Sequence, residues 1–280
     1  LEEAINKLLT SNADLENEVT VRHEAEDKLK KSQEELQNAL DKEKELGNLK
    51  TRFVSMASHE FRTPLATILS SVSLISRYET TEQQEQRLKH VNRIKDSVSN
   101  LTGILNDFLS LSKLDEGKIE TSFDKINLVE LVKNVEEELL GILKSSQKIH
   151  FSFNTPNCNF ISDSRILKNI LFNLISNAIK YSENDIYCRF EIKLSKCVIC
   201  IKDTGIGIPE DDQKYLFDRF FRATNAVNIQ GTGLGLNIVK RYIELLNGSI
   251  SFKSTINEGT EFIVDLPKLE LKQSNIYTNG

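Results

Sequence analysis

The sequence lacks two features that would point to particular partners: an excess of basic residues and a long apolar run. Its 36 Lys and Arg residues are outnumbered by 41 Asp and Glu residues, which gives 280 residues a net charge of −5. The chain as a whole therefore offers no positive field for nucleic acid, and we expect no nucleic-acid partner. No stretch reaches the roughly 18 consecutive apolar residues of a membrane-spanning helix, so we expect no direct membrane contact by this chain.

Cysteine is scarce, and its spacing does not favour a metal or redox site. The four cysteines are Cys158, Cys188, Cys197 and Cys200. Cys197 and Cys200 form a CxxC pattern inside a strand-like run, where residues three apart point to opposite faces. They could not bind one metal together, and no second pair follows. We expect free thiols, as in a reducing cytoplasm.

Proline is absent from the first 50 residues, and glycine occurs there once, at Gly47. A 4-3 spacing of mainly apolar residues predicts a two-stranded coiled coil over residues 1–50, with Asn12 favouring a fixed register. The repeat changes phase between Leu40 and Leu46, which indicates either a switch point or a harmless irregularity of the helix. The seam positions are Leu1, Ile5, Leu8, Asn12, Leu15, Val19, Arg22, Glu26, Leu29, Gln33, Leu36 and Leu40.

Residues 53–65 form the stretch around which the chain is organised. On a helix, His59 and Thr63 share one face, because residues four apart are neighbours. Pro64 clashes with the carbonyl of Glu60, so we expect a bend beside the histidine. An exposed imidazole next to a carboxylate suits a nucleophile with a proton acceptor. The alternative for an isolated His59 is an ordinary surface histidine.

Two apolar stripes predict a helical hairpin over residues 51–117. The first helix covers 51–78, a polar turn covers 78–84, and Gly117 ends the second helix. One hairpin cannot bury stripes this wide, so we expect two to pair into a four-helix bundle, which predicts a homodimer. The second stripe consists of Leu88, Val91, Ile94, Val98, Leu101, Leu105 and Phe108, widened by Ile104 and Leu111, and the first contains Ile68, Leu69, Val72 and Ile75.

The pattern changes over residues 118–267, where short strand-like runs alternate with amphipathic helices. This mixture predicts an α+β sandwich with helices on one face of a mixed sheet. Asn127 and Glu130 predict a capping box that opens a helix over 128–143. Residues 268–280 form a polar tail that we expect to fray. The expected strands are 149–153, 187–194, 197–201, 249–254 and 260–266.

Asparagines line one side of the predicted helix over residues 163–181. Asparagine is a poor helix former, so Asn169, Asn173 and Asn177 on one stripe carry a cost in helix propensity. A neutral amide oxygen can complete the shell of a Mg²⁺ ion that keeps waters and phosphates. Lys180, one turn further, supplies positive charge for phosphate, although a lone lysine is more often simply solvated.

Three further motifs follow in the second half of the chain. Asp203 comes directly after a strand-like run and precedes two glycines in 203–209, where its carboxylate can accept a hydrogen bond from the amine of adenine. Aromatic residues in 216–222 could anchor a loop. Glycines in 231–235 open a helix and can cradle phosphate. The chain lacks a Walker-A motif, and none of its glycine motifs fits a Rossmann or protein-kinase loop.

Taken in order, these five motifs resemble the H, N, G1, F and G2 boxes of sensor histidine kinases of two-component systems. The resemblance covers residues 51–267 and implies a multidomain chain. A coiled-coil helix (1–50) and a dimerisation and histidine-phosphotransfer hairpin (51–117) would precede a GHKL-type, or Bergerat, ATP-binding sandwich (118–267). The implied enzyme is a protein histidine kinase.

The resemblance also implies roles for individual residues. His59 would attack the γ-phosphate of ATP while Glu60 takes the ring proton. Asn177 would bind Mg²⁺ with Asn173 nearby. Asp203 would hold the adenine amine. Phosphate contacts are implied for Lys180, Tyr181 and Arg222, adenine-pocket positions for Gly205, Gly207 and Thr260, and F-box and lid positions for Phe217, Phe220, Gly231, Gly233, Leu234 and Gly235, with the lid over 223–230.

The partners and location follow from the same resemblance. A response regulator would accept the phosphoryl group, and Glu60-x-x-Thr63 resembles a phosphatase motif in which Thr63 orients water. Position 1 is Leu1 and the helical pattern is already under way there, so we expect an upstream sensor domain in a longer parent protein. We expect this part of the parent to be cytoplasmic. The competing functions are a phosphatase or scaffold that binds ATP without autophosphorylation, a GHKL ATPase, and a purely structural coiled coil.

Overall fold

The computed structural model describes residues 2–78, 80–155 and 158–268, so nearly all of the predicted tail lies outside the described residues. The chain forms two compact units, residues 1–55 and residues 56–280. The boundary between these units falls inside the first helix.

The first unit belongs to α1 (Glu2–Ile75), a helix of 74 residues that continues without a break through Gly47. The predicted helix is therefore confirmed, and its backbone stays helical where the repeat changes phase. Predicted seam residues such as Leu15, Leu29 and Leu36 are exposed in the single chain, Leu36 by 71%.

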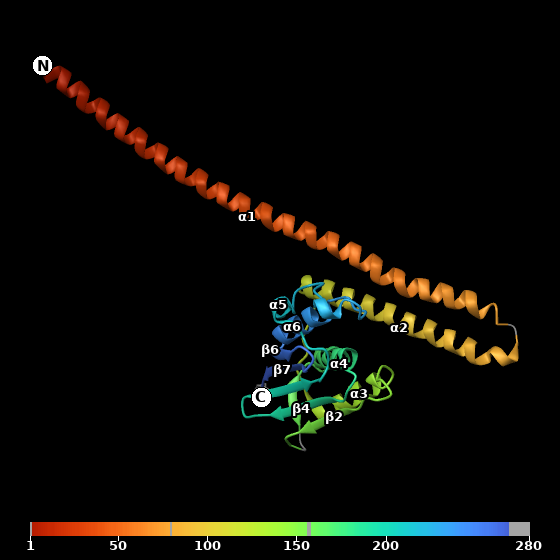
Figure 1. The fold of residues 1–280 in the computed structure, drawn as a ribbon. Coiled ribbons are helices and arrows are strands. Elements are labelled where there is room, and N and C mark those ends of the chain that lie inside the picture. The colour runs from red at the N-terminus through yellow and green to blue at the C-terminus, as the bar shows by residue number, and fades with distance from the viewer. Residues whose placement is uncertain (1, 79, 156–157, 269–280) are drawn as a thin grey trace, which may run out of the picture. The chain divides into compact units, whose positions relative to one another are not determined.

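The second unit begins with a helical hairpin. A 3-10 turn (Thr81–Gln83) joins the end of α1 to α2 (Gln84–Asp115), and the two helices lie side by side (Figure 1). Phe61 on α1 contacts Phe108 on α2, with ring centroids 6.1 Å apart. The helix α1 runs through Pro64, and the bend expected beside His59 stays a prediction. The predicted hairpin is confirmed.

Only part of the apolar stripe predicted to face inward is buried in the single chain. Leu69 is 70% exposed and Leu88 57%, whereas the buried row of α2, with seven-residue spacing, includes Ile104 and Leu111 of the predicted stripe. The reason is that two helices bury only the narrow seam between them. The exposed stripe is left for another surface to cover. The buried row of α2 is His90, Ser97, Ile104 and Leu111.

His90 contradicts an expectation, because its place beside the seam predicts a solvated side chain. Instead it is buried near the tip of the hairpin, with Nδ1 3.4 Å from the Ser71 hydroxyl. Its ring stacks on Tyr78 at a centroid distance of 5.8 Å. Ser71 is small enough to admit the imidazole between the helices, which the spacing along a single helix does not reveal.

Gly117 ends α2 as predicted. Its φ of 63° is the left-handed conformation that glycine adopts without a steric penalty. The amide of Lys118 donates to the carbonyl of Lys113 at 3.0 Å, and that of Gly117 donates to Leu114 at 3.3 Å. These two bonds define a Schellman motif, which separates the hairpin from the segment that follows.

A mixed sheet organises the rest of the second unit, with strand order β2-β4-β5-β7-β6. The β2–β4 pair is parallel and the other pairs are antiparallel. All five expected strands are confirmed, which establishes the α+β class. They span Ile149–Phe153 (β2), Ile186–Ile192 (β4), Lys196–Lys202 (β5), Ser249–Thr255 (β6) and Gly259–Pro267 (β7).

A second, two-stranded sheet pairs β1 (Asp124–Asn127) with β3 (Asn159–Ser162). The sequence predicts neither strand, because four residues are too few to show an alternating pattern. The helices are α3 (Leu128–Leu139), α4 (Ser164–Tyr181), the short α5 (Glu210–Gln213) and α6 (Gly235–Leu245), with a 3-10 turn at Thr224–Ala226.

The core of this unit lies between the five-stranded sheet and the helices α4 and α6. Leu167, Leu171 and Ile175 of α4 are fully buried, as is Ile199 of β5. Burial of each such side chain contributes about 1.5–3 kcal/mol. The opposite side of α4 is less buried and is left to face a cavity.

The four cysteines are buried and free. In β5, Cys197 alternates with the core residues Ile199 and Ile201, whereas Cys200 points to the other face, where its thiol contacts Glu261 at 3.0 Å. The two CxxC residues thus face opposite ways, as predicted. No group of three or more His, Cys, Asp or Glu side chains within the described ranges could hold a metal ion.

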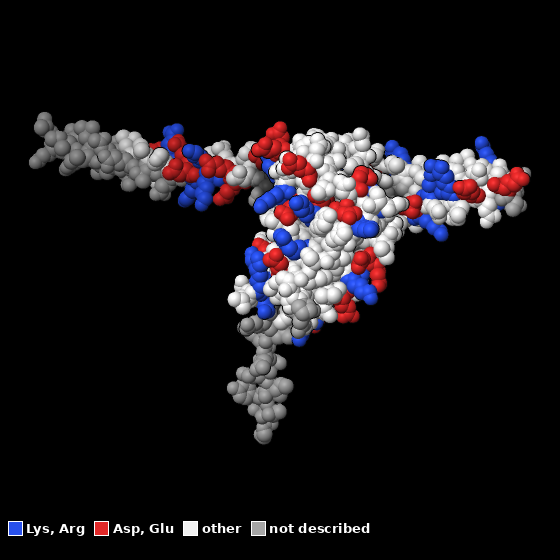
Figure 2. All heavy atoms as spheres, turned by 60° about the horizontal axis from the view of Figure 1, so that its bottom comes forward, with Lys and Arg blue, Asp and Glu red and all other residues white. Residues whose placement is uncertain are grey.

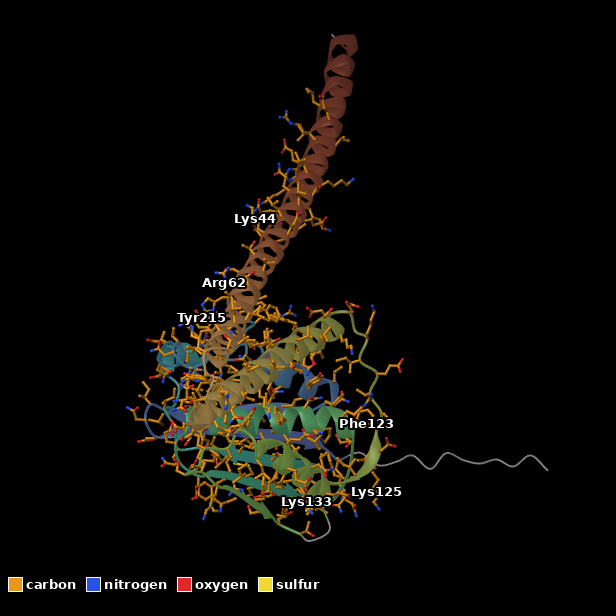
Figure 3. All side chains as sticks on the ribbon, turned by 90° about the vertical axis from the view of Figure 1, so that its right-hand side faces the viewer. Lys44, Arg62, Phe123, Lys125, Lys133 and Tyr215 are labelled. Carbon is orange, nitrogen blue, oxygen red and sulfur yellow. The ribbon has the colours of Figure 1, made fainter. Side chains whose placement is uncertain are left out.

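Asn127 caps α3 as predicted. Its side-chain oxygen accepts from the amides of Val129 at 3.1 Å and Glu130 at 3.4 Å. The helix ends at Leu139, four residues before the expected end, close to Gly141. Its exposed side carries Lys133 (Figure 3).

We expect Asn127→Ala to lower the free energy of unfolding by about 1 kcal/mol, because two amides of the first turn lose their acceptor. Urea unfolding of the variant, its control and the wild type measures this. Asn134→Ala is the matched control, since Asn134 is an exposed residue inside the same helix and caps nothing. Equal loss in both variants would contradict a capping role.

Two surface properties bear on the expected partners. In the described part of the chain, no helix has the length and apolar character needed to cross a membrane. On the face drawn in Figure 2, basic and acidic side chains are interspersed.

Candidate active site

A cavity of about 520 Å³ lies in the second unit, between α4, the loop after β5, the glycine loop before α6 and part of α2. The cavity brings together residues from all four of the motifs predicted to bind nucleotide. Its lining includes the predicted residues Asn173, Asn177, Lys180, Tyr181, Asp203, Gly207, Arg222, Gly231, Gly233, Gly235 and Thr260.

Four predicted binding residues do not line the cavity. Phe217 packs edge-on against Phe252 at a centroid distance of 5.9 Å, and Leu234 is completely buried. Phe220 packs against the core, and a Cβ on Gly205 would lie 2.1 Å from the Tyr181 carbonyl oxygen. These residues form the layer behind the cavity wall. Their neighbours Leu216 and Phe221 line the cavity in the F-box region.

Helix α4 is fixed at its start by Asp163. This buried carboxylate accepts from the amides of Arg165 at 2.9 Å and Ile166 at 3.1 Å, and also from the amide of Ser122 at 2.9 Å. Burial opposes ionisation of Asp163, but the hydrogen bonds from Ser122 and its other donors keep its pKa below the usual value. The cap fixes the start of α4 and thereby the position of Asn173 and Asn177 along the cavity.

The asparagines of α4 suit a magnesium ion that arrives with phosphates. The side-chain nitrogen of Asn173 donates to the Asn169 carbonyl at 3.0 Å, which leaves its oxygen directed toward the loop at Gly235. Asn177 lines the cavity, and no described residue hydrogen-bonds to its side-chain amide. Neutral amide oxygens facing a cavity fit Mg²⁺, which prefers oxygen ligands and retains waters.

Lys180 is a half-buried cation of the site. Burial lowers its pKa to about 8, and the nearby charge of Arg222 contributes, whereas Glu60 and Asp107 act in the opposite direction. Its ammonium lies over the ring of Tyr181 at 5.0 Å and close to Gly231, where a Cβ would be 2.6 Å away. The cation therefore sits between the helix and the glycine loop, where phosphates are expected.

Arg222 is committed mainly to the lid. Its Nη2 donates to the carbonyls of Ala226 at 3.0 Å and Val227 at 2.8 Å, and also to that of Ile229. Its Nε is buried and has no hydrogen-bond partner among the described residues. An unsatisfied buried donor next to a cavity fits an anionic ligand.

Asp203 contributes a buried carboxylate to the cavity wall. Its Oδ1 accepts from the amides of Gly205 at 2.8 Å and Thr260 at 3.3 Å, while no described residue hydrogen-bonds to Oδ2. Burial raises the pKa of this carboxyl, although both hydrogen bonds oppose the change. One oxygen is thus fixed by the backbone and the other can accept from a ligand.

Two glycines of the cavity wall have a backbone conformation that other residues rarely adopt. Gly207 has a φ of 63°, and a Cβ there would lie 2.0 Å from the Thr255 carbonyl oxygen. Gly233 has a φ of 67°, and a Cβ would lie 2.7 Å from the Phe221 carbonyl oxygen. Both close approaches require glycine, because any other side chain would clash with these carbonyl groups. The two loops can therefore pack tightly in the cavity wall.

Helix α2 contributes a wall of the cavity that the motifs in the sequence do not predict. Asn100, Gly103, Ile104 and Asp107 line the cavity, although the sequence assigns α2 only to the hairpin. A signal existed, because Asp107 lies three residues after buried Ile104 and four before buried Leu111, where an apolar residue is expected.

His59 is on the exposed side of α1, with 75% of its side chain accessible. Glu60 is 7% exposed, and its Oε1 lies 3.4 Å from His59 Nδ1. Thr63 is exposed one turn further, and its hydroxyl donates to the His59 carbonyl at 3.4 Å. Arg62 projects from the same helix (Figure 3). His59 is not among the residues that line the cavity.

Comparison with known protein families gives two matches in the order that the motifs predict. Residues 49–117 match the His Kinase A (phospho-acceptor) domain. Residues 162–270 match the histidine kinase-, DNA gyrase B- and HSP90-like ATPase family.

Curated relatives include the circadian input-output histidine kinase CikA of Synechococcus elongatus, 31% identical over 245 residues, and the sensor histidine kinase GacS of Pseudomonas protegens, 35% identical over 232 residues. The matched regions cover 85% and 79% of this chain, but the chain spans only 32% and 25% of the length of these relatives.

Solved structures share the fold. The Acinetobacter baumannii histidine kinase AdeS has a TM-score of 0.56 at 22% identity, covering 76% of this chain and 98% of its own. The histidine kinase ThkA, solved in complex with the response regulator protein TrrA, has a TM-score of 0.57 at 24% identity, covering 78% of this chain and 61% of its own. The two domain matches in their order, together with these relatives, show that the chain belongs to the sensor histidine kinases of two-component signalling.

Proposed function

We propose that this chain is the kinase region of a two-component sensor and transfers the γ-phosphoryl group of ATP to His59. The observation that carries the proposal is the cavity, whose lining combines a carboxylate suited to an adenine amine with two half-buried cations. A nucleotide whose adenine binds at Asp203 directs its phosphates toward Lys180 and Arg222. The exposed imidazole of His59 beside Glu60 supplies the nucleophile.

The site residues contribute to nucleotide binding, to orientation of the phosphates or to proton transfer. Asp203 Oδ2 accepts from the adenine amine, while Gly207 and Thr260 shape the pocket. Lys180, Tyr181 and Arg222 contact the phosphates, and the loop with Gly231, Gly233 and Gly235 approaches them through its backbone. Glu60 accepts the imidazole proton as the phosphorus–nitrogen bond forms and the bond from the γ-phosphorus to the β–γ bridging oxygen breaks, which releases ADP. Phosphoryl transfer depends mainly on such positioning and charge stabilisation.

Asn177, with Asn173 beside it, would hold Mg²⁺. The ion, when bound, would neutralise phosphate charge in the cavity. The amide oxygens support this assignment because they are neutral and face the cavity. They can complete the coordination shell of Mg²⁺ without adding negative charge beside the phosphates.

The test of the proposed function uses the whole chain with Mg²⁺ and γ-labelled ATP. We expect a labelled phosphoprotein that is labile in acid and stable in base, as a phosphohistidine is. Steady ATP hydrolysis without label would favour a GHKL ATPase instead, and ATP binding without either activity would favour a scaffold.

The pH dependence of nucleotide binding tests the role of Lys180. Its pKa of about 8 in the free chain means that the ammonium is present at pH 7 and mostly lost at pH 9. Bound phosphates favour the charged form and hold its proton, so affinity is full below pH 8 and falls as pH rises. We expect about a tenfold weaker affinity for ADP at pH 9 than at pH 7, measured by calorimetry.

Lys180→Arg should bind ADP almost independently of pH over this range, because guanidinium stays charged. Lys253→Arg, at an exposed position in β6, should keep the wild-type dependence. The same slope in Lys180→Arg as in the wild type would assign the titration to another group.

We further propose transfer of the phosphoryl group from His59 to an aspartate of a response regulator, and the reverse task of dephosphorylating that regulator with Thr63 orienting water. The exposure of His59 and Thr63 one turn apart supports access by a partner protein. The complex of the histidine kinase ThkA with the response regulator protein TrrA is a precedent for such a partner.

We propose the same domain boundaries as the sequence indicates: a signalling coiled coil over 1–50, the phosphoacceptor hairpin over 51–117, the ATP-binding domain over 118–267 and a tail over 268–280. The exposed stripe with Leu69, Leu88 and Leu105 supports a homodimer through a four-helix bundle. A cytoplasmic location and a sensor domain upstream in the parent protein complete the proposal.

A further inference from the structure

We propose that Asp107 of α2 is an internal competitor of the nucleotide phosphates, occupying the cationic end of the cavity until ATP displaces it. This inference rests on the proposed function, because it assigns a regulatory role to the same cavity. It makes α2 part of the nucleotide site as well as part of the hairpin.

The position of Asp107 carries the first step. Its Oδ2 accepts from the Thr232 hydroxyl at 2.9 Å, and Thr232 lies between the two cavity glycines Gly231 and Gly233. The same hydroxyl accepts from the amide of Leu234 at 3.2 Å. The carboxylate is thus held against the loop that would cradle phosphates.

The charges around the site carry the second step. The Arg222 guanidinium lies close enough to Lys180 to contribute to the lowered pKa of its ammonium, because like charges repel. Asp107 and Glu60 are the acids that act on Lys180. In the chain without nucleotide, these acids supply the negative charge that phosphates would otherwise supply.

The third step is that Asp107 and a polyphosphate cannot both be accommodated favourably. Asp107 is largely buried, and burial raises the pKa of its carboxyl, with the Thr232 hydrogen bond and the Lys180 charge opposing this change. Nucleotide phosphates beside Lys180 would add further negative charge at short range. The Asp107 carboxylate therefore lowers the affinity of the cavity for nucleotide phosphates. By linkage, bound phosphates weaken the contact of Asp107 with the glycine loop by the same free energy.

A second contact holds the same helix but lies outside the cavity. Asp115 near the end of α2 accepts from Arg219 at 2.6 and 3.0 Å and also pairs with Arg241, whose Nη2 donates to the Leu114 carbonyl at 2.9 Å. These contacts of Arg219 and Arg241 with the end of α2 keep the helix next to the ATP-binding domain when the Asp107 contact breaks. Displacement of Asp107 then requires only a local change.

The test compares adenosine, ADP and ATP on the whole chain and its Asp107→Asn variant, in Mg²⁺-containing buffer. Asparagine keeps the shape and can still accept from Thr232, but it carries no charge. We expect ADP and ATP to bind about tenfold more tightly to the variant, with ATP gaining at least as much as ADP. We expect adenosine, which has no phosphate, to bind both proteins equally. Calorimetry or ligand-observed NMR measures the affinities.

Asp96→Asn is the matched control, because Asp96 is an exposed acid on the same helix and does not line the cavity. It should leave all three affinities unchanged. Unchanged or weaker ATP binding by Asp107→Asn would overturn the inference, and so would an equal gain for adenosine, which would indicate steric obstruction instead. Thermal unfolding verifies that each variant is folded.

The inference and the proposed function fail in different ways. If the wild type binds ATP and labels His59 but Asp107→Asn shows no gain, the inference alone is wrong. If neither protein binds ATP, the proposed function is wrong as well.

Discussion

His59→Gln is expected to abolish labelling of the chain by γ-labelled ATP, with a loss of more than about 10³-fold. Glutamine is polar and of similar size, but it offers no ring nitrogen that can accept the phosphoryl group. His59 is exposed on α1 and packs against nothing that its removal would leave as a cavity, so the fold should persist. ATP binding, measured separately, should stay at the wild-type value because His59 does not line the cavity.

The matched control for this prediction is His23→Gln. His23 is an exposed histidine of the same helix, far from residues 53–65 in the sequence. It should label at the wild-type rate. Labelling of His59→Gln at more than a few per cent of wild type would place the phosphoacceptor elsewhere, and loss of labelling in both variants would indicate an effect on the helix.

Asp203→Asn is expected to weaken ATP binding by about 10²-fold. It should also remove the preference for ATP over GTP that we expect of this carboxylate, because it accepts from the amine of adenine and repels the carbonyl oxygen of guanine. Oδ1 accepts two backbone amides, so the amide oxygen of asparagine would take that place. The NH₂ group would then replace Oδ2 and meet the adenine amine as donor against donor. A site that leaves polar groups unpaired rejects a ligand by factors of this size.

The control for Asp203 is Asp211→Asn in the short helix α5, where the acid is exposed and does not line the cavity. Competition between ATP and GTP for each protein measures the preference. An Asp203→Asn chain that still prefers ATP by the wild-type ratio would show that another group reads the base.

The sequence determined the features that depend on neighbouring residues. Glycine at position 117 predicted the end of α2, and Asn127 predicted the start of α3, because caps are set within a few residues. Five strands followed from short apolar runs, and the exposure of His59 beside Glu60 followed from helical geometry. The sequence alone also supported the histidine kinase family through the order of its motifs.

The tertiary structure decided which distant segments meet. Asp107 and Thr232 are 125 residues apart, and no local pattern predicts their hydrogen bond. The same holds for the pairing of β1 with β3 and for the burial of His90 beside Ser71. Phe217, Phe220 and Leu234 lie in the right motifs but behind the cavity wall, because side-chain direction depends on packing. Caps, turns and helical faces follow from neighbouring residues in the sequence. The charge balance of the cavity depends instead on distant segments that the fold brings together.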